Sequence, residues 1–490
     1  MVGFAVDECW QLTKGHIHMQ ASEHLAFDLG ASSGRAVLGR FDGSRMEMQE
    51  VHRWATPNEV EGERLYWDLD AVWGSMQEGL AIALKEAPDL CSLSVDSWGV
   101  DYVPLGSTMQ TLRRAHVYRD PRSASGEVLA WQRVAREELY SMTGVASHPI
   151  NTLFQVLADE QMTPEVYAAT CCRLLIADYM HWRFCDRFVA EMSLASTTQL
   201  LSANSRSWSV EAMKALQIDP VTWPRVVPSG TVLGPVRDIP NVAVIAGCSH
   251  DTACAVAAIP ADERSSWAFL SSGTWSLLGV EIPTPICTPA AMEAGFTNEV
   301  GYGGTIRLLK NLTGLWVLQE CERVWREAGM NFDYTELLDE ASRAAPPVYT
   351  IDFNDPQFST PGNMPKRIAD WCRERSMSVP SERGDIVRLI LESLAEVYRT
   401  TLESLSTLLG RRFECLHVVG GGSRNRLLNQ WTADRCGVPV IAGPSEATAL
   451  GNLLIQAGAM NRLPADSSVR EVSAASVQTE TFQPNQSGGP

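Results

Sequence analysis

Two short stretches of this 490-residue chain share one design, and this repeat constrains the fold more than any other feature. Residues 24–43, HLAFDLGASSGRAVLGRFDG, predict a strand, a turn of small residues and a second strand, and residues 267–279, WAFLSSGTWSLLG, follow the same order. The matching residues are Ala26-Phe27 with Ala268-Phe269, and Ser32-Ser33-Gly34 with Ser271-Ser272-Gly273. Repeated units half a chain apart indicate a duplicated domain, although two short hairpins can also match by chance. We therefore expect two lobes that each direct a turn toward one cleft, where they would hold a triphosphate.

The first of these turns has the composition of a phosphate-binding turn. The small residues Gly30, Ser32, Ser33 and Gly34 leave backbone N–H groups unobstructed, as a turn that holds phosphate oxygens requires. Asp28 ends the first predicted strand, where its carboxylate is placed to hold Mg²⁺ through water, because that ion prefers hard oxygen ligands. Since many Gly/Ser turns have no ligand, the motif alone leaves an ordinary hairpin open.

A second site candidate lies in residues 246–256, AGCSHDTACAV. Val242 to Ala246 predict a buried strand that ends at Gly247, and the residues from Thr252 onward predict a helix. Asp251 therefore lies at a strand-to-helix turn, where its carboxylate can reach a substrate hydroxyl and act as a general base. The alternative is a helix N-cap, since aspartate is common at that position.

Composition excludes several classes of function. Lys and Arg number 40 and Asp and Glu 58, and the resulting formal charge of -18 disfavours binding to nucleic acid or to an anionic membrane surface. No apolar stretch approaches the roughly 20 residues of a membrane span, and the start of the chain has no signal-peptide pattern, so we expect a cytoplasmic protein. The 12 cysteines are scattered without a metal-ligand spacing, which predicts buried free thiols.

The second half of the chain alternates predicted helices and strands. Residues 385–409 predict a core helix, and residues 416–422, LHVVGGG, predict a strand that runs into three glycines before the next helix. This glycine run lets a nucleotide lie against backbone, but it lacks the G-x-G-x-x-G pattern of a dinucleotide site. We expect a long loop or lid over residues 347–384, and segments outside the packed fold at residues 1–23 and 467–490.

Four motifs together resemble the FGGY sugar kinases of the actin-like ATPase superfamily: DLGASSGR at 28–35, HDT at 250–252, LSSGTWSL at 270–277 and VVGGGSRNRLLNQ at 418–430. Further motifs are similar to the branch of that family that phosphorylates L-rhamnulose: DSWGVDYV at 96–103, VYRD at 117–120, NTLFQ at 151–155, STTQL at 196–200, LLKNLTGLWVLQE at 308–320 and AGPSEATALGN at 442–452. The resemblance extends from about Leu25 to Gln456, and the motifs occur in the family's order.

The resemblance implies an α/β fold of two ribonuclease-H-like lobes, over residues 24–258 and 259–466, around a nucleotide cleft. It implies that Asp251 is the catalytic base and that the sugar contacts are Gly99, His250, Asp251, Thr252 and Asn311. The nucleotide contacts that it implies are Ala31, Ser32, Ser33, Gly34, Arg35, Thr274, Gln319 and Gly421, with Asp28 as the metal residue. From the residues alone, Gly99 could equally be a packing glycine, Asn311 a helix cap and Gln319 part of a solvated helix face.

The resemblance also implies an activity, namely the ATP- and Mg²⁺-dependent phosphorylation of L-rhamnulose at its C1 hydroxyl. The alternatives are another ketose such as L-fuculose or xylulose, or a non-catalytic actin-like sensor of sugar or nucleotide. A sensor has no use for a general base, so Asp251 favours an enzyme. We expect a monomer or homodimer whose partners are small molecules, with no nucleic acid and no membrane.

Overall fold

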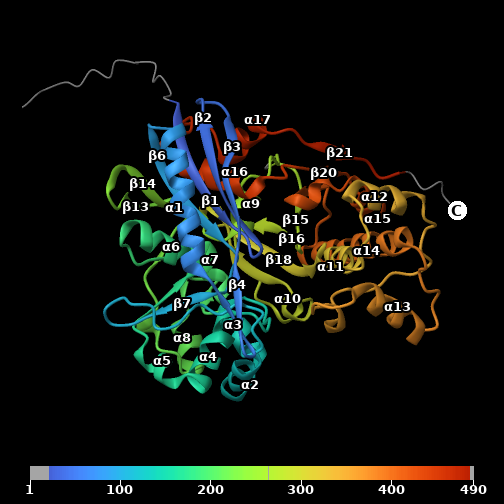
Figure 1. Ribbon diagram of the computed structural model, residues 1–490, viewed down its shortest axis with the longest axis horizontal. Coiled ribbons are helices and arrows are strands. Elements are labelled where there is room, and N and C mark those ends of the chain that lie inside the picture. Colours follow the sequence, from blue (N-terminus) through green and yellow to red (C-terminus); the bar gives the residue numbers. More distant parts are fainter. Residues whose placement is uncertain (1–20, 263, 486–490) are drawn as a thin grey trace, which may run out of the picture.

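The chain folds into two α/β lobes that lie side by side (Figure 1). The computed structural model describes residues 21–262 and 264–485. Most of the segment expected to lie outside the fold, residues 1–20, therefore falls outside the described residues, but Ser22 and Glu23 already belong to the first strand. No helix in the described residues is long and apolar enough to cross a membrane.

The first lobe is built on a six-stranded sheet. In spatial order its strands are β13 (Thr231–Val236), β14 (Ile239–Ala246), β6 (Leu90–Ser97), β1 (Ser22–Leu29), β2 (Ser33–Phe41) and β3 (Met46–Ala55). Strands β1, β2 and β3 are antiparallel neighbours, whereas β6 and β14 continue the sheet in parallel. Their central residues, such as Phe27 and Val95, are fully buried because helices cover both faces.

The second lobe repeats this arrangement in a seven-stranded sheet. Its strands in spatial order are β17 (Thr297–Val300), β18 (Ile306–Thr313), β16 (Trp275–Ile282), β15 (Trp267–Ser272), β19 (Cys415–Val419), β20 (Val440–Ala442) and β21 (Glu480–Phe482). Here β15, β16 and β18 are antiparallel, and β19 and β20 are parallel to β15. Five consecutive strands of each sheet, β14-β6-β1-β2-β3 and β20-β19-β15-β16-β18, therefore share one order and one set of directions, as expected for a duplication.

The duplication is correct at the level of strands, but one of the predicted residue matches is out of register. Phe27 and Phe269 occupy equivalent buried positions in β1 and β15. Gly30, Ala31 and Ser32 separate β1 from β2, whereas only Gly273 and Thr274 separate β15 from β16. As a result Ser33 opens the second strand of its hairpin while Ser272 closes the first strand of the other, so the two Ser-Ser-Gly tripeptides are not equivalent.

Helices pack on both sheets. Those of the first lobe are α1 (Leu69–Glu86), α2 (Ser123–Arg133), α3 (Arg136–Thr143), α4 (Thr152–Met162), α5 (Pro164–Ala169), α6 (Ile176–Cys185), α7 (Met192–Ala195), α8 (Val210–Ala215) and α9 (Asp251–Ala257). Those of the second are α10 (Pro289–Glu293), α11 (Trp316–Glu327), α12 (Tyr334–Arg343), α13 (Met364–Glu374), α14 (Arg383–Leu409), α15 (Arg426–Cys436), α16 (Ala447–Ala459) and α17 (Val469–Ser476). Short two-stranded pairs complete the fold: β4 (Asn58–Glu61) with β5 (Arg64–Trp67), β7 (Tyr102–Leu105) with β8 (Cys172–Leu175), β9 (Ala190–Glu191) with β12 (Val226–Val227), and β10 (Leu201–Ser202) with β11 (Ser207–Trp208).

Elements from the second half of the chain, among them α16 and β17, attach to the first lobe. Helix α16 packs against β1 and β6, where Gln456 donates to the backbone oxygen of Leu25 over 3.0 Å. The helix crosses α9 so closely that a Cβ on Gly451 would lie 2.0 Å from the backbone oxygen of Cys254. Strand β17 also contacts the first lobe, because the backbone N–H of Val300 donates to Ser196 over 2.9 Å.

The structure corrects two expectations about segments without strong periodicity. The expected mobile tail is ordered at least to residue 485: Ser468 and Glu471 form a capping box at the start of α17, Val472 is buried, and β21 pairs with β20. Residues 486–490 lie outside the described residues. The expected lid at 347–384 contains α13 and buries Phe353 and Phe358, so it is packed onto the lobe rather than free above the cleft.

Candidate active site

Three turns from the two lobes meet at one cavity of about 580 Å³. The first is the β1–β2 turn with Gly30, Ala31 and Ser32, and the second is the β15–β16 turn with Gly273 and Thr274. The third follows β19, where Gly420 and Gly421 line the same cavity. The glycines matter here, because Gly420 has a φ of 81° and a Cβ on Gly422 would lie 2.0 Å from the Ser272 hydroxyl. The expectation that both hairpin turns face one cleft is confirmed.

Asp251 projects into this cavity from the start of α9. Strand β14 ends at Ala246, and a short turn brings the chain to His250, which is the N-cap residue, so Asp251 occupies the first helical position. The N-cap alternative for Asp251 is therefore wrong. Buried Glu191 stabilises this turn, since its carboxylate accepts the backbone N–H of Ser249 over 2.9 Å.

The two carboxylate oxygens of Asp251 have different surroundings. Oδ1 accepts the backbone N–H of Thr252 over 2.5 Å and its hydroxyl over 3.1 Å, and it lies 3.4 Å from His250 Nε2. Oδ2 has no hydrogen bond within the described residues, and the side chain is 35% exposed to the cavity. Burial raises the pKa of Asp251 above its ordinary value, the neighbouring His250 opposes that rise, and Asp28 adds to it. A carboxylate with one free oxygen and a raised pKa is suited to accepting a proton.

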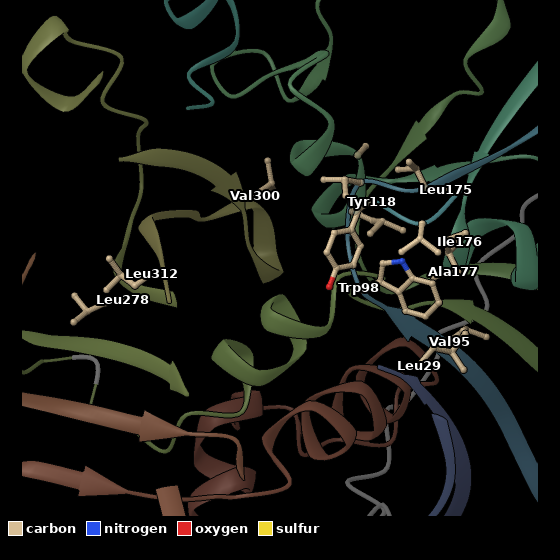
Figure 2. Packing of buried hydrophobic residues seen from close by; sticks show 14 of the residues in the cluster. Leu29, Val95, Trp98, Tyr118, Leu175, Ile176, Ala177, Leu278, Val300 and Leu312 are labelled. Atoms are coloured by element: carbon tan, nitrogen blue, oxygen red, sulfur yellow. The ribbon is translucent and has the colours of Figure 1, made fainter. Parts of the chain in front are cut away.

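Aromatic side chains form one end of the cavity. Trp98 and Tyr118 both line it and lie close together in Figure 2. One oxygen of the buried carboxylate of Asp101 accepts from Trp98 Nε1 over 3.0 Å and from the backbone N–H of Tyr118 over 3.1 Å. The same oxygen accepts from Trp67 Nε1 over 2.7 Å. Asp101 thus holds both Trp98 and Tyr118 in position at the cavity.

Gly99 and Asn311 line the cavity from different lobes. Gly99 follows Trp98, and a Cβ there would lie 3.0 Å from the Thr197 hydroxyl, so this glycine both packs tightly and borders the site. Asn311 lies in β18 opposite Leu277, which excludes the helix-cap alternative. His250 and Thr252 also line the cavity, so all the residues assigned to the sugar from the family resemblance are together.

The residues assigned to the nucleotide are only partly together. Ala31, Ser32, Thr274, Gln319 and Gly421 line the cavity, and the Thr274 hydroxyl donates to Gln319 Oε1 over 3.1 Å. Gln319 is therefore not simply part of a solvated helix face.

Ser33, Gly34 and Arg35 are not among the residues that line the cavity. The Trp54 ring covers Gly34, since a Cβ there would lie 2.5 Å from it. Arg35 pairs with Asp28 over 2.7 Å and with Glu446. These three residues lie in β2 behind the turn rather than in the turn itself.

Asp28 lies beside a second carboxylate that sequence reasoning did not assign. Asp28 and Asp96 are directly paired residues of β1 and β6. Asp96 is fully buried, and its Oδ1 has no hydrogen-bond partner among the residues that the structure describes. Burial, followed by the charge of Asp28, raises the pKa of Asp96 well above the ordinary value. No group of three His, Cys, Asp or Glu side chains in the part of the chain described here is arranged to hold a metal by itself. Neither Asp28 nor Asp96 is among the residues that line the cavity, and the oxygens left for a cation such as Mg²⁺ are the buried Oδ1 of Asp96 and the Asp28 oxygen that Arg35 does not contact.

Several cavity residues carried little signal in the sequence. Arg119 lies over the Tyr118 and Trp316 rings and borders the cavity, whereas Arg122 of the same VYRDPR segment is buried in an ion pair with Asp159 over 2.6 Å. The sequence could not separate a cavity arginine from a structural one. Glu299 of β17 also lines the cavity, and nothing in its neighbourhood in the sequence indicates that position.

Two lobes of duplicated topology, with glycine-containing turns from both meeting at a cleft that exposes one oxygen of Asp251, define a two-lobed α/β protein with a site between its lobes. The chain belongs to the FGGY family of carbohydrate kinases: the N-terminal domain of that family matches residues 24–259 and the C-terminal domain matches residues 268–460. It is 38% identical over 466 residues to a rhamnulokinase of Bacteroides thetaiotaomicron, covering 94% of this chain and 95% of the relative. It is 39% identical over 472 residues to a rhamnulokinase of Enterococcus faecalis, covering 94% of each.

Solved structures of kinases for other substrates have the same fold. A gluconate kinase of Lactobacillus acidophilus superimposes with a TM-score of 0.76 at 16% identity, covering 95% of this chain and 94% of that one. A xylulose kinase of the same organism superimposes with a TM-score of 0.74 at 15% identity, with the same coverage. At this level of identity the similarity establishes the fold alone, and the expectation of two α/β lobes around a central cleft is confirmed.

Proposed function

We propose that this protein transfers the γ-phosphoryl group of ATP to the C1 hydroxyl of L-rhamnulose, giving ADP and L-rhamnulose 1-phosphate. The observation that carries the proposal is the position of Asp251 in one cavity with the two hairpin turns and the polar residues Asn311 and Thr252. Near-full-length similarity to rhamnulokinases supports L-rhamnulose over L-fuculose or xylulose. A free general base in the cavity favours an enzyme over a sensor.

In the proposed reaction Asp251 Oδ2 accepts the proton of the C1 hydroxyl while the hydroxyl oxygen attacks the γ-phosphorus. The bond to the bridging oxygen breaks, and ADP leaves with that oxygen. Phosphoryl transfer of this kind depends on positioning and on stabilisation of charge. The backbone N–H groups of the turns at Ala31 and Thr274 would contribute both, since each turn borders the cavity.

We assign Mg²⁺ to the carboxylates of Asp28 and Asp96. The unsatisfied Oδ1 of Asp96 and the oxygen of Asp28 that Arg35 leaves free are the donors available there. The cation would offset the charge of the triphosphate. Arg35 is then a residue that orients Asp28 rather than a direct phosphate contact.

A coupled assay for ADP release over a panel of ketoses tests the proposal. We expect the highest kcat/KM for L-rhamnulose, lower values for L-fuculose and xylulose, and a 1-phosphate product by phosphorus NMR. A higher kcat/KM for another ketose would show that the proposed substrate is wrong, while the proposed phosphoryl transfer would stand. Absence of sugar-dependent ADP release with every ketose, in protein that binds ATP, would favour the sensor instead.

A further inference from the structure

The side chain of His250, next to the base, is held by two residues from the other lobe. Arg307 Nη2 lies 3.1 Å from His250 Nδ1, and Glu299 Oε2 lies 3.4 Å from the same atom. Glu299 and Arg307 fall within the range matched by the C-terminal family domain, whereas His250 and Asp251 fall within the N-terminal one. The cluster therefore joins the proposed base of one domain to the sheet of the other.

Glu299 and Arg307 form an unusually well-enclosed ion pair. They are directly opposite each other on the antiparallel strands β17 and β18, and Arg307 Nη2 lies 3.1 Å from Glu299 Oε2. The Arg307 side chain is 0% exposed and that of Glu299 is 6% exposed. Burial opposes ionisation of Glu299, but Arg307 and His250 outweigh it and hold its pKa below the ordinary value. A buried ion pair contributes little net stability, because the cost of desolvation offsets the attraction, so its role must be sought in geometry.

That geometry determines which nitrogen of His250 carries hydrogen. A guanidinium can only donate and Arg307 Nη2 is closer to Nδ1 than Glu299 Oε2 is, so the contacts favour a neutral imidazole that accepts at Nδ1 and carries its hydrogen on Nε2. A protonated imidazole would donate from Nδ1 to Glu299 and would again carry hydrogen on Nε2. In both states the Nε2–H lies toward Asp251 Oδ1, at a nitrogen-to-oxygen distance of 3.4 Å.

The consequence reaches the base itself. Oδ1 of Asp251 already accepts from Thr252, and the Nε2–H of His250, with its nitrogen 3.4 Å away, adds an electrostatic attraction at the same oxygen. The carboxylate is then held by one oxygen, and Oδ2 is the oxygen that remains for a substrate hydroxyl. Loss of the correct ring orientation would let the carboxylate rotate, and a displacement of about 1 Å can reduce a rate by about 100-fold.

We propose that Glu299 and Arg307 are positioning residues for the phosphoryl transfer, which fix the orientation and the Nε2–H form of His250 and through it the free oxygen of Asp251. This inference rests on the proposed role of Asp251 as the base. It also makes assembly of the base depend on the placement of β17 and β18 against the first lobe.

The first test is structural and independent of turnover. Nitrogen-15 NMR of the whole protein at pH 8, with the His250 signals identified by their loss in His250→Gln, reports which ring nitrogen carries hydrogen. We expect hydrogen on Nε2 in the unmodified protein. In Arg307→Met the donor to Nδ1 is gone, and we expect hydrogen on Nδ1, donated to Glu299. A neutral ring with hydrogen on Nδ1 in the unmodified protein would overturn the proposal.

The second test measures kinetics in Glu299→Gln, which keeps the shape of the side chain and is the safer variant if Arg307→Met does not fold. We expect kcat to fall by between about 10-fold and 100-fold, with KM for ATP unchanged. The matched control is Glu392→Gln on α14, which removes a carboxylate 8% exposed and 2.8 Å from both Arg388 and Arg435. The control variant should have an unchanged kcat. An equal loss of kcat in both variants would mean that removal of any buried carboxylate disturbs the fold, and it would contradict a positioning role for Glu299.

A double variant separates positioning from direct sugar binding. If Glu299 acts through His250, the variant His250→Gln/Glu299→Gln should have the kcat of His250→Gln alone, within about 2-fold. If the kcat loss of the double variant were the product of the two single losses, or if KM for the sugar rose without a fall in kcat, Glu299 would instead act on the substrate directly. If Asp251→Asn retained turnover while the NMR result held, the proposed base would fail and the orientation of His250 would stand.

Discussion

The side-chain amide of Asn452 donates to the carboxylate of Asp96 over 2.6 Å, although the two residues are 356 positions apart. Asn452 lies on α16 and Asp96 at the end of β6, beside the strand that carries Asp28. A helix from the end of the chain therefore contacts the carboxylate pair that we assign to the cation. The first lobe supplies the carboxylates, and the second half of the chain holds one of them in place.

The proposed base gives the first prediction. Asp251→Asn should keep the fold and nucleotide binding but lower kcat by about 100-fold or more, because the amide cannot accept the hydroxyl proton. Turnover with L-rhamnulose and calorimetric titration with a non-hydrolysable ATP analogue measure the two properties. Near-normal turnover would exclude the mechanism.

The raised pKa of Asp251 predicts the pH dependence of kcat/KM. The base acts in its ionised form, so activity should fall as pH falls through a pKa above the ordinary aspartate value of 3.8. The neighbouring His250 opposes the rise, so His250→Gln should move this acid limb to higher pH. A pH profile of both proteins measures the shift, and a limb that moves to lower pH would contradict the assignment.

Asp101 should control sugar binding without touching the sugar. Burial raises the pKa of Asp101 to about 6. Four N–H donors favour the ionised carboxylate and limit that rise. Asp101→Leu removes the oxygen that accepts from both Trp98 and Tyr118, which leaves these donors unsatisfied at a cost of about 1–3 kcal/mol each and loosens both residues. We expect a lower Tm and a KM for the sugar raised on the order of 10-fold, with KM for ATP serving as the internal control. An equal rise in both KM values would point to general loosening.

Truncation tests the ordered tail. Removal of everything after Asp466 deletes α17, whose Arg470 pairs with Glu281 and donates to the backbone oxygen of Val256 over 3.1 Å. We expect that protein to be insoluble or to unfold at a markedly lower temperature, whereas truncation after Asn485 should behave as the full chain. Equal thermal stability of the two truncated proteins would show that α17 and β21 are dispensable.

Lobe closure is the last prediction. The turns at Ala31 and Thr274 come from different lobes and border one cavity, so ATP entry requires them to separate. We expect small-angle scattering to give a smaller radius of gyration with L-rhamnulose and a non-hydrolysable nucleotide than with the free protein. An unchanged radius at saturating ligand would leave only local ordering of loops.

Much of the fold was predictable because its signals are local. The strand, turn and helix around Asp251 follow from Val242–Ala246, Gly247 and Thr252–Val256, and the structure has them as β14 and α9. The same holds for α14, which ends at Gly410 with a φ of 63°. Periodicity and punctuating glycines act within a few residues, so the sequence displays them directly.

What could not be predicted depends on contacts between distant residues. Glu299 has no neighbour in the sequence that indicates a place at the site, because strand pairing puts it there. Asn452 ends the AGPSEATALGN motif, but its contact with Asp96 results from helix docking and is not indicated by that motif. The C-terminal helix α17, in contrast, did have a local signal in the sequence. Ser468 and Glu471 have the spacing of a capping box, and Val469 and Val472 have helical spacing, but the polar composition of the segment obscured this pattern. For this segment, residue spacing predicts the structure better than composition does.

Helix α16 also has a consequence for how the protein is made. The helix covers β1 and β6, yet it is translated after every strand of the sheet it covers. At about 5–20 residues per second, synthesis leaves that apolar face without its partner for many seconds after its strands have emerged from the ribosome. The N-terminal family domain expressed alone would therefore retain that uncovered apolar surface.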